Sequence, residues 1–120
     1  MRKKILVVDD EEGLRLLYKE ELEDEGAEVS LAASGMEALE KLEKGSVDLV
    51  LLDIKMPGMD GVELLRRVKE KWKDLPVILC TAYPHYKHDL GTWASDAYVV
   101  KSSDLTELKQ TIKEILSKKH

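Results

Sequence analysis

The sequence predicts a doubly wound α/β domain, in which helices cover both faces of a parallel β-sheet. Short apolar runs alternate along the chain with amphipathic stretches of helical periodicity. Four of the five apolar runs are nearly continuous, as is typical of parallel strands that are buried on both faces. Right-handed crossovers place the intervening helices on both sides of such a sheet, so this alternation favours one domain over residues 1–120.

Five strands are expected, at residues 5–8, 27–32, 49–52, 77–80 and 97–100. The second alternates apolar and polar residues, which is typical of an edge strand. Four helices are predicted from apolar residues at helical spacing. The apolar residues of the four helices, in chain order, are Leu14, Leu17, Tyr18 and Leu22; Ala38, Leu39 and Leu42; Val62, Leu65, Val68 and Trp72; and Leu105, Leu108, Ile112, Ile115 and Leu116.

Capping signals mark several helix ends. A serine or aspartate followed three residues later by glutamate is typical of a helix N-terminus. Three such pairs occur: Ser34 with Glu37, Asp60 with Glu63, and Asp104 with Glu107. Gly26 and Gly45 follow helical stretches, where we expect a residue in the left-handed conformation.

Composition excludes several classes of function. A formal net charge of −5 disfavours direct binding of nucleic acid, which requires a basic surface. No apolar run approaches the ~20 residues of a membrane span, and the apolar run after the basic N-terminus is too short for a signal peptide. Cys80 is the one cysteine, which we expect in the core rather than as a reactive thiol. We therefore expect a cytoplasmic protein.

Polar residues follow four of the predicted strands. The first strand ends in Asp9 and Asp10, the third in Asp53, the fourth in Thr81 and the fifth in Lys101. Ligands of doubly wound sheets bind outside the carboxyl ends of the strands. We therefore expect three carboxylates, a hydroxyl and an ammonium group to converge at one edge of the sheet.

Three crowded carboxylates repel one another unless a cation compensates their charge. Mg²⁺ fits this need, because it prefers oxygen ligands. The alternative for Asp9 and Asp10 is that they only cap the helix that begins near Glu12, and Asp53 alone could be a solvated acid at a strand end.

These segments resemble a response-regulator receiver domain of two-component signalling, of the chemotaxis-receiver type. Residues 5–11, Ile-Leu-Val-Val-Asp-Asp-Glu, resemble the opening of that family, and residues 53–61 resemble its phosphorylation-site loop. Thr81-Ala82 and Lys101 follow in the right order. The resemblance implies a flavodoxin-like sheet of five parallel strands in the order 2-1-3-4-5.

The resemblance also implies roles around a Mg²⁺ ion. Asp53 would accept a phosphoryl group from a phosphohistidine. Asp10 and Asp53 would bind the metal directly, Asp9 would act through metal-bound water, and the backbone carbonyl of Lys55 would complete the protein ligands. Positioning and charge neutralisation of this kind are what phosphoryl transfer requires.

Three more residues receive roles from the resemblance. Thr81 and Lys101 would each contact a phosphoryl oxygen. Tyr98 would be the aromatic switch that turns inward as Thr81 moves, and its alternative is an ordinary strand aromatic.

The sequence departs from the family pattern in two places. Ser102 follows Lys101, where the family usually has a proline after a cis bond. Because a cis bond costs about 2.5–4 kcal/mol before other residues, we expect a trans bond here. The segment from Thr81 to Lys101 is short for the family and has a poor helical stripe, so its helix, the fourth in the family order, should be short or distorted.

The implied function is phosphorelay signalling with a sensor histidine kinase or histidine phosphotransfer protein as donor, and an output domain or effector protein as possible partner. The chain would catalyse its own phosphorylation and slow autodephosphorylation, with Lys55 and Tyr83 covering the approach of water, and would have no separate substrate. A pseudo-receiver that only binds proteins is the alternative. A flavodoxin-like cofactor binder is disfavoured, because no glycine-rich loop follows the first strand. The sequence leaves open whether the domain stands alone.

Overall fold

The computed structural model describes residues 3–53, 61–81, 97–100 and 104–118. In this part of the chain the elements are β1 (Lys4–Val8), α1 (Glu12–Asp24), β2 (Glu28–Ala32), α2 (Gly35–Lys44), β3 (Leu49–Leu52), α3 (Gly61–Lys71), β4 (Val77–Thr81), β5 (Ala97–Val100) and α4 (Thr106–Lys118). The predicted strands are confirmed, with bounds that differ by one residue at most. The helix expected between β4 and β5 lies outside the described residues.

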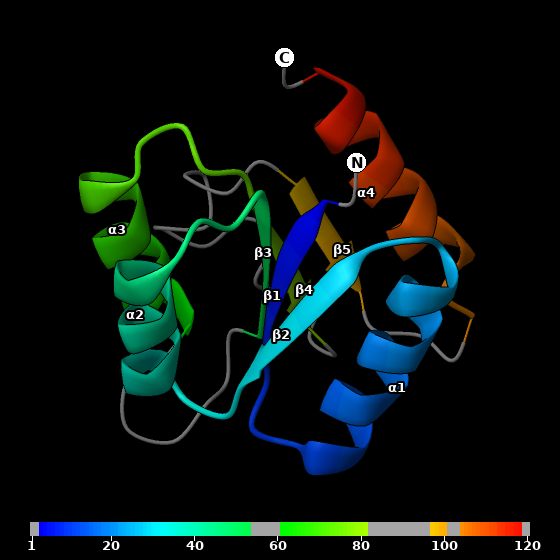
Figure 1. The fold of residues 1–120 in the computed structure, drawn as a ribbon, viewed down its shortest axis with the longest axis horizontal. Coiled ribbons are helices and arrows are strands. Elements are labelled where there is room, and N and C mark those ends of the chain that lie inside the picture. The colour runs from blue at the N-terminus through cyan, green and yellow to red at the C-terminus, as the bar shows by residue number, and fades with distance from the viewer. Residues whose placement is uncertain (1–2, 54–60, 82–96, 101–103, 119–120) are drawn as a thin grey trace.

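The strands form one parallel sheet in the order β2-β1-β3-β4-β5, as predicted (Figure 1). β2 lies at an edge, in agreement with its alternating pattern. The register pairs Val8 with Ala32 on β2 and with Leu52 on β3. The carboxyl ends of β1 and β3 therefore lie side by side at the same edge of the sheet.

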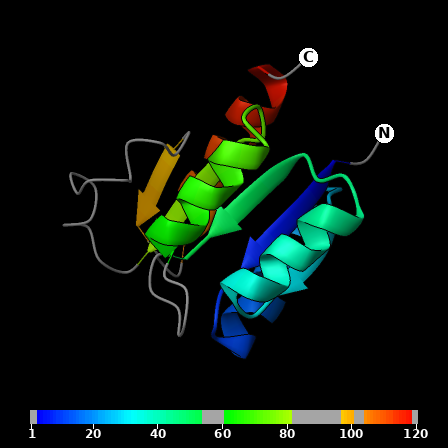
Figure 2. The same cartoon turned by 90° about the vertical axis from the view of Figure 1, so that its left-hand side faces the viewer.

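Helices cover both faces of the sheet. In Figure 1, α1 and α4 lie on one side of the strands, and α2 and α3 lie on the other. Figure 2 looks from the side of α2 and α3, which lie next to each other in front of the sheet. The doubly wound architecture expected from the sequence is thus present.

Two buried clusters explain why the strand sequences are nearly continuous in apolar residues. Side chains alternate across a strand, so β1 sends Leu6 and Val8 to the cluster under α2 and α3, and Ile5 and Val7 to the cluster under α1 and α4. All four side chains are almost completely buried. Burial on both faces is what fixes the sheet as the central layer.

The helix ends agree with the predictions in part. Ser34 accepts a hydrogen bond from the backbone N–H of Glu37, and Gly26 has the expected positive φ of 96° after α1. The expectation for Gly45 is wrong, because this residue is extended, with φ −160° and ψ 166°. Its N–H still completes a helical bond to Lys41, and the chain then leaves α2 without a left-handed residue.

The start of α4 is held by Asp104. Its carboxylate accepts hydrogen bonds from the backbone N–H and the hydroxyl of Thr106, at 2.9 and 2.6 Å. The bond from the Thr106 hydroxyl is the main cause that lowers the pKa of Asp104. The aspartate therefore marks the beginning of this helix, whereas Asp60 before α3 lies outside the described residues.

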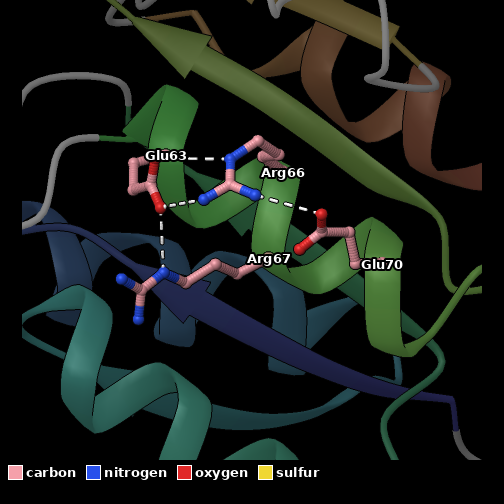
Figure 3. Close-up of polar contacts among 4 residues, drawn as sticks. All are labelled: Glu63, Arg66, Arg67 and Glu70. Atoms are coloured by element: carbon pink, nitrogen blue, oxygen red, sulfur yellow. Dashed lines mark hydrogen bonds and ion pairs between the residues drawn. The ribbon is translucent and has the colours of Figure 1, made fainter.

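The outward face of α3 carries a chain of ion pairs (Figure 3). Glu63 Oε2 lies 2.5 Å from Arg66 Nη2 and 2.9 Å from Arg67 Nε, and Arg66 Nη1 lies 3.0 Å from Glu70. Hydrogen bonds from Arg66 and then Arg67 lower the pKa of Glu63. Exposed pairs of this kind stabilise a fold weakly, so α3 is held mainly by buried side chains such as Leu64.

Candidate functional site

The candidate site begins where β1 and β3 end. Asp9 follows the last residue of β1 and Asp53 follows the last residue of β3. The backbone N–H of Asp53 donates to Val8 at 3.0 Å, and that of Asp9 donates to Ala32 at 3.1 Å. The hydrogen bonding between strands thus continues one residue past each strand, which fixes the backbone of both acids.

Three carboxylates gather at this edge, as the sequence predicts. Asp9, Asp10 and Asp53 each offer an oxygen, and the three oxygens all lie within 4.8 Å of one another. Asp9 and Asp53 are 2% and 6% exposed, whereas Asp10 faces solvent. Two buried acids beside a third concentrate negative charge at the mouth of the core, an arrangement that favours a bound cation.

The carboxylate of Asp9 also serves the adjoining turn. Its Oδ1 accepts a hydrogen bond of 3.0 Å from the backbone N–H of Glu11, which precedes α1. Asp9 thus holds the residue that precedes the helix, and it also belongs to the acid cluster, so capping is not its one role. Glu11, at the N-cap position itself, makes no side-chain capping bond.

Arg15 is a residue of this site that sequence reasoning missed. It lies in α1, half-buried, and its Nη1 donates to the backbone carbonyl of Asp9 at 2.7 Å. Side chains of a helix point back toward its N-terminus, so a long cation in the first turns can reach the residues before the helix. That direction is the signal that could have identified Arg15.

A buried pair lies beneath the acids on the α1 side of the sheet. The hydroxyl of Tyr18 is 3.6 Å from the sulfur of Cys80, and both side chains are almost fully buried. Burial raises the pKa of Tyr18 above its usual range, and the charges of Cys80, Asp9 and Asp53 raise it further. Cys80 is thus a core residue, as expected.

The remaining predicted residues are placed only in part. Thr81 is the last residue of β4, paired with Val100, so the β4 backbone carries it to the carboxyl edge. Tyr98 is half-buried against the cluster under α2 and α3, which fits both readings of this residue. Lys55 and Lys101 lie outside the described residues.

A separate hollow lies at the amino ends of the strands, away from the acids. It has a volume of about 180 Å³ and lies between α1 and α4, with Ile5, Leu22 and Ile112 among its apolar walls.

None of the helices in the described ranges is long and apolar enough to span a membrane.

Comparison with known proteins identifies relatives over nearly the whole chain. A family model for the response regulator receiver domain matches residues 5–113. Sporulation initiation phosphotransferase F of Bacillus subtilis is 39% identical over 121 residues, which cover 97% of this chain and 95% of that protein. The transcriptional regulatory protein PhoP of the same organism is 36% identical over 118 residues, or 97% of this chain but only 49% of the regulator.

Solved structures of a response regulator are also similar to this chain. The response regulator TrrA of Thermotoga maritima, in complex with Mg²⁺-BeF, superposes with a TM-score of 0.92 at 52% identity, covering 94% of this chain and 98% of TrrA. The structure of TrrA with the histidine kinase ThkA gives a TM-score of 0.91 at 52% identity, covering 95% and 98%.

Proposed function

The chain belongs to the response regulator receiver domain family of two-component signalling, and on that premise we propose that Asp53 accepts a phosphoryl group from a phosphohistidine. The observation that carries this proposal is the cluster of Asp9, Asp10 and Asp53 at the carboxyl edge of the sheet. Asp53 is the acid that directly follows the central strand β3, with its backbone tied to Val8. A carboxylate oxygen held there forms the bond to phosphorus as the bond to the imidazole nitrogen of the donor breaks.

The donor set at the cluster fits Mg²⁺. It consists of carboxylate oxygens, two of them on buried residues, and such a set is matched by a hard cation. Asp10 and Asp53 would hold the ion directly, Asp9 would act through metal-bound water, and the Lys55 carbonyl would add a further oxygen. When bound, the ion supplies positive charge that offsets the charge of the phosphoryl oxygens. The complex of TrrA with Mg²⁺-BeF supports this assignment.

Thr81 and Lys101 are assigned to the phosphoryl oxygens. Thr81 ends β4 beside the central strand β3, and Lys101 directly follows β5 in the chain. A hydroxyl donor and an ammonium group stabilise charge that develops during transfer. Tyr98 on β5 would change its packing as Thr81 moves, and thereby alter the surface offered to partners.

The donor is a sensor histidine kinase or a histidine phosphotransfer protein. The complex between TrrA and ThkA supports this class of partner. An output domain or separate effector would receive the signal, since the chain spans about half the length of PhoP and nearly all of phosphotransferase F. In this scheme the chain catalyses only its own phosphorylation and dephosphorylation. We also propose that the protein is cytoplasmic.

Phosphorylation in the absence of a kinase tests the proposal. The protein is incubated with acetyl phosphate and Mg²⁺, and its intact mass is measured. We expect the parent to gain one phosphoryl group and Asp53→Asn to gain none. Asp24→Asn is the matched control, because Asp24 is an exposed aspartate at the far end of α1.

Two outcomes would contradict the proposal. Labelling that survives in Asp53→Asn would show that another residue is the acceptor. A parent chain that gains no mass with or without Mg²⁺ would favour a module that binds proteins without cycling phosphate.

A further inference from the structure

The guanidinium group of Arg15 is bound to the backbone of the acid-bearing turn. Arg15 Nη1 donates to the carbonyl oxygen of Asp9 at 2.7 Å, a length typical of charge-assisted hydrogen bonds. The side chain is half-buried where α1 meets the end of β1. Water screens such a bond less than it screens an exposed ion pair, so the contact is worth more than the surface pairs of α3.

This bond is one of three hydrogen bonds from described residues that hold Asp9. The N–H of Asp9 donates to Ala32 at 3.1 Å, and its Oδ1 accepts from Glu11 at 3.0 Å. The carbonyl held by Arg15 belongs to the planar peptide group that joins Asp9 to Asp10. Fixing this carbonyl therefore fixes the direction in which the chain enters Asp10, whose side chain is exposed.

From this geometry we propose that Arg15 is a positioning residue for the metal site: by holding the Asp9 carbonyl, it orients Asp10 toward the ion. The inference rests on the proposed function, because it concerns Mg²⁺ at the cluster of Asp9, Asp10 and Asp53. Arg15 acts through the backbone of Asp9, and it is not itself a ligand.

Because Arg15 is charged, the direction in which its removal changes Mg²⁺ binding distinguishes an effect of charge from an effect of positioning. A guanidinium bound to the Asp9 carbonyl repels a second cation at the adjoining cluster, so its charge by itself weakens Mg²⁺ binding. Its hydrogen bond, in contrast, pre-orients a ligand and strengthens binding. Removal of Arg15 therefore tightens Mg²⁺ binding if charge dominates and weakens it if positioning dominates.

The experiment is a calorimetric Mg²⁺ titration of the parent, Arg15→Gln and Arg15→Lys. We expect Arg15→Gln to raise the Mg²⁺ dissociation constant about tenfold, the low end of the effect of losing an outer-shell partner. Arg15→Lys keeps the charge and can still donate a hydrogen bond, but it lacks the planar guanidinium, so its constant should lie between those of the parent and Arg15→Gln. Lys19→Gln is the matched control, because Lys19 is a cation on the same helix that pairs with Glu23. Its exposed charge is screened, so it should change the constant roughly twofold at most.

Urea unfolding separates positioning from a general structural role. Bound Mg²⁺ stabilises the folded chain by an increment that depends on its dissociation constant. In excess Mg²⁺, a tenfold weaker constant should reduce that increment by about 1.4 kcal/mol in Arg15→Gln. A loss of stability that is equal with and without Mg²⁺ would show that Arg15 is only structural, and would overturn the proposal.

Three results of the titration would also overturn it. Tighter Mg²⁺ binding by Arg15→Gln would mean that charge, not position, is what Arg15 contributes. No Mg²⁺ binding by the parent would overturn both this inference and the proposed function. Normal binding by the parent with no change in Arg15→Gln would overturn this inference alone.

Discussion

The hydroxyl oxygen of Tyr18 lies 3.6 Å from the sulfur of Cys80, and this buried contact joins α1 to the strand that ends in Thr81. The two residues are 62 positions apart in the chain. Either group could be the donor. Because Cys80 directly precedes Thr81, the contact anchors the end of β4 next to a proposed phosphoryl-binding residue.

Removal of the Tyr18 hydroxyl should cost stability. Tyr18→Phe keeps the ring and removes the hydrogen bond, so we expect the free energy of unfolding to fall by about 0.5–1.5 kcal/mol. Urea denaturation at neutral pH measures this change. The same substitution in a Cys80→Ala background should cost less, and an equal cost in both backgrounds would show that the two groups do not interact.

Alkaline pH should reveal the raised pKa of Tyr18. Burial keeps its phenol protonated in the folded chain, whereas the unfolded chain loses that proton above about pH 10. A raised folded pKa gives stability that is complete below the unfolded pKa and is lost as pH rises above it. The parent should therefore lose more stability than Tyr18→Phe between about pH 9 and 11. Equal losses in urea unfolding would mean that the phenol ionises normally.

The metal-binding roles of Asp9 and Asp10 should differ. One oxygen of Asp9 already accepts a hydrogen bond from Glu11, whereas Asp10 is exposed at the cluster. Asp10→Ala should therefore raise the Mg²⁺ dissociation constant much more than Asp9→Ala. Calorimetric titration measures both constants, with unfolding curves to verify that each variant is folded. Equal losses would show that the direct and water-mediated roles are wrongly divided.

Slow autodephosphorylation is predicted from Lys55 and Tyr83, which lie outside the described residues. Neither is an acid or amide suited to hold an attacking water, and a lysine close to the phosphoryl group stabilises the ground state. The double variant Lys55→Asn with Tyr83→Glu should lose its phosphoryl group faster than the parent in Mg²⁺ buffer. Mass measurements over time give the rates, and unchanged decay would exclude shielding by this pair.

Much of the fold could be predicted because its signals are local. Continuous apolar runs reveal strands buried on both faces, and all five strands lie within one residue of their predicted bounds. The Ser34 cap and the left-handed Gly26 follow from residue chemistry that acts within one turn of helix. The prediction of a left-handed Gly45 is wrong, because glycine permits that conformation but does not require it.

The local sequence reveals which residues end the strands, and a parallel sheet brings those ends to one edge. That is why the sequence alone predicts that Asp9, Asp10 and Asp53 lie together. In contrast, the bonds of Arg15 to the Asp9 carbonyl and of Tyr18 to Cys80 arise only when the chain has folded. Such contacts depend on how α1 packs against the sheet and on which side-chain rotamers that packing allows. Helical periodicity predicts the buried face of a helix but not the residue that each side chain contacts.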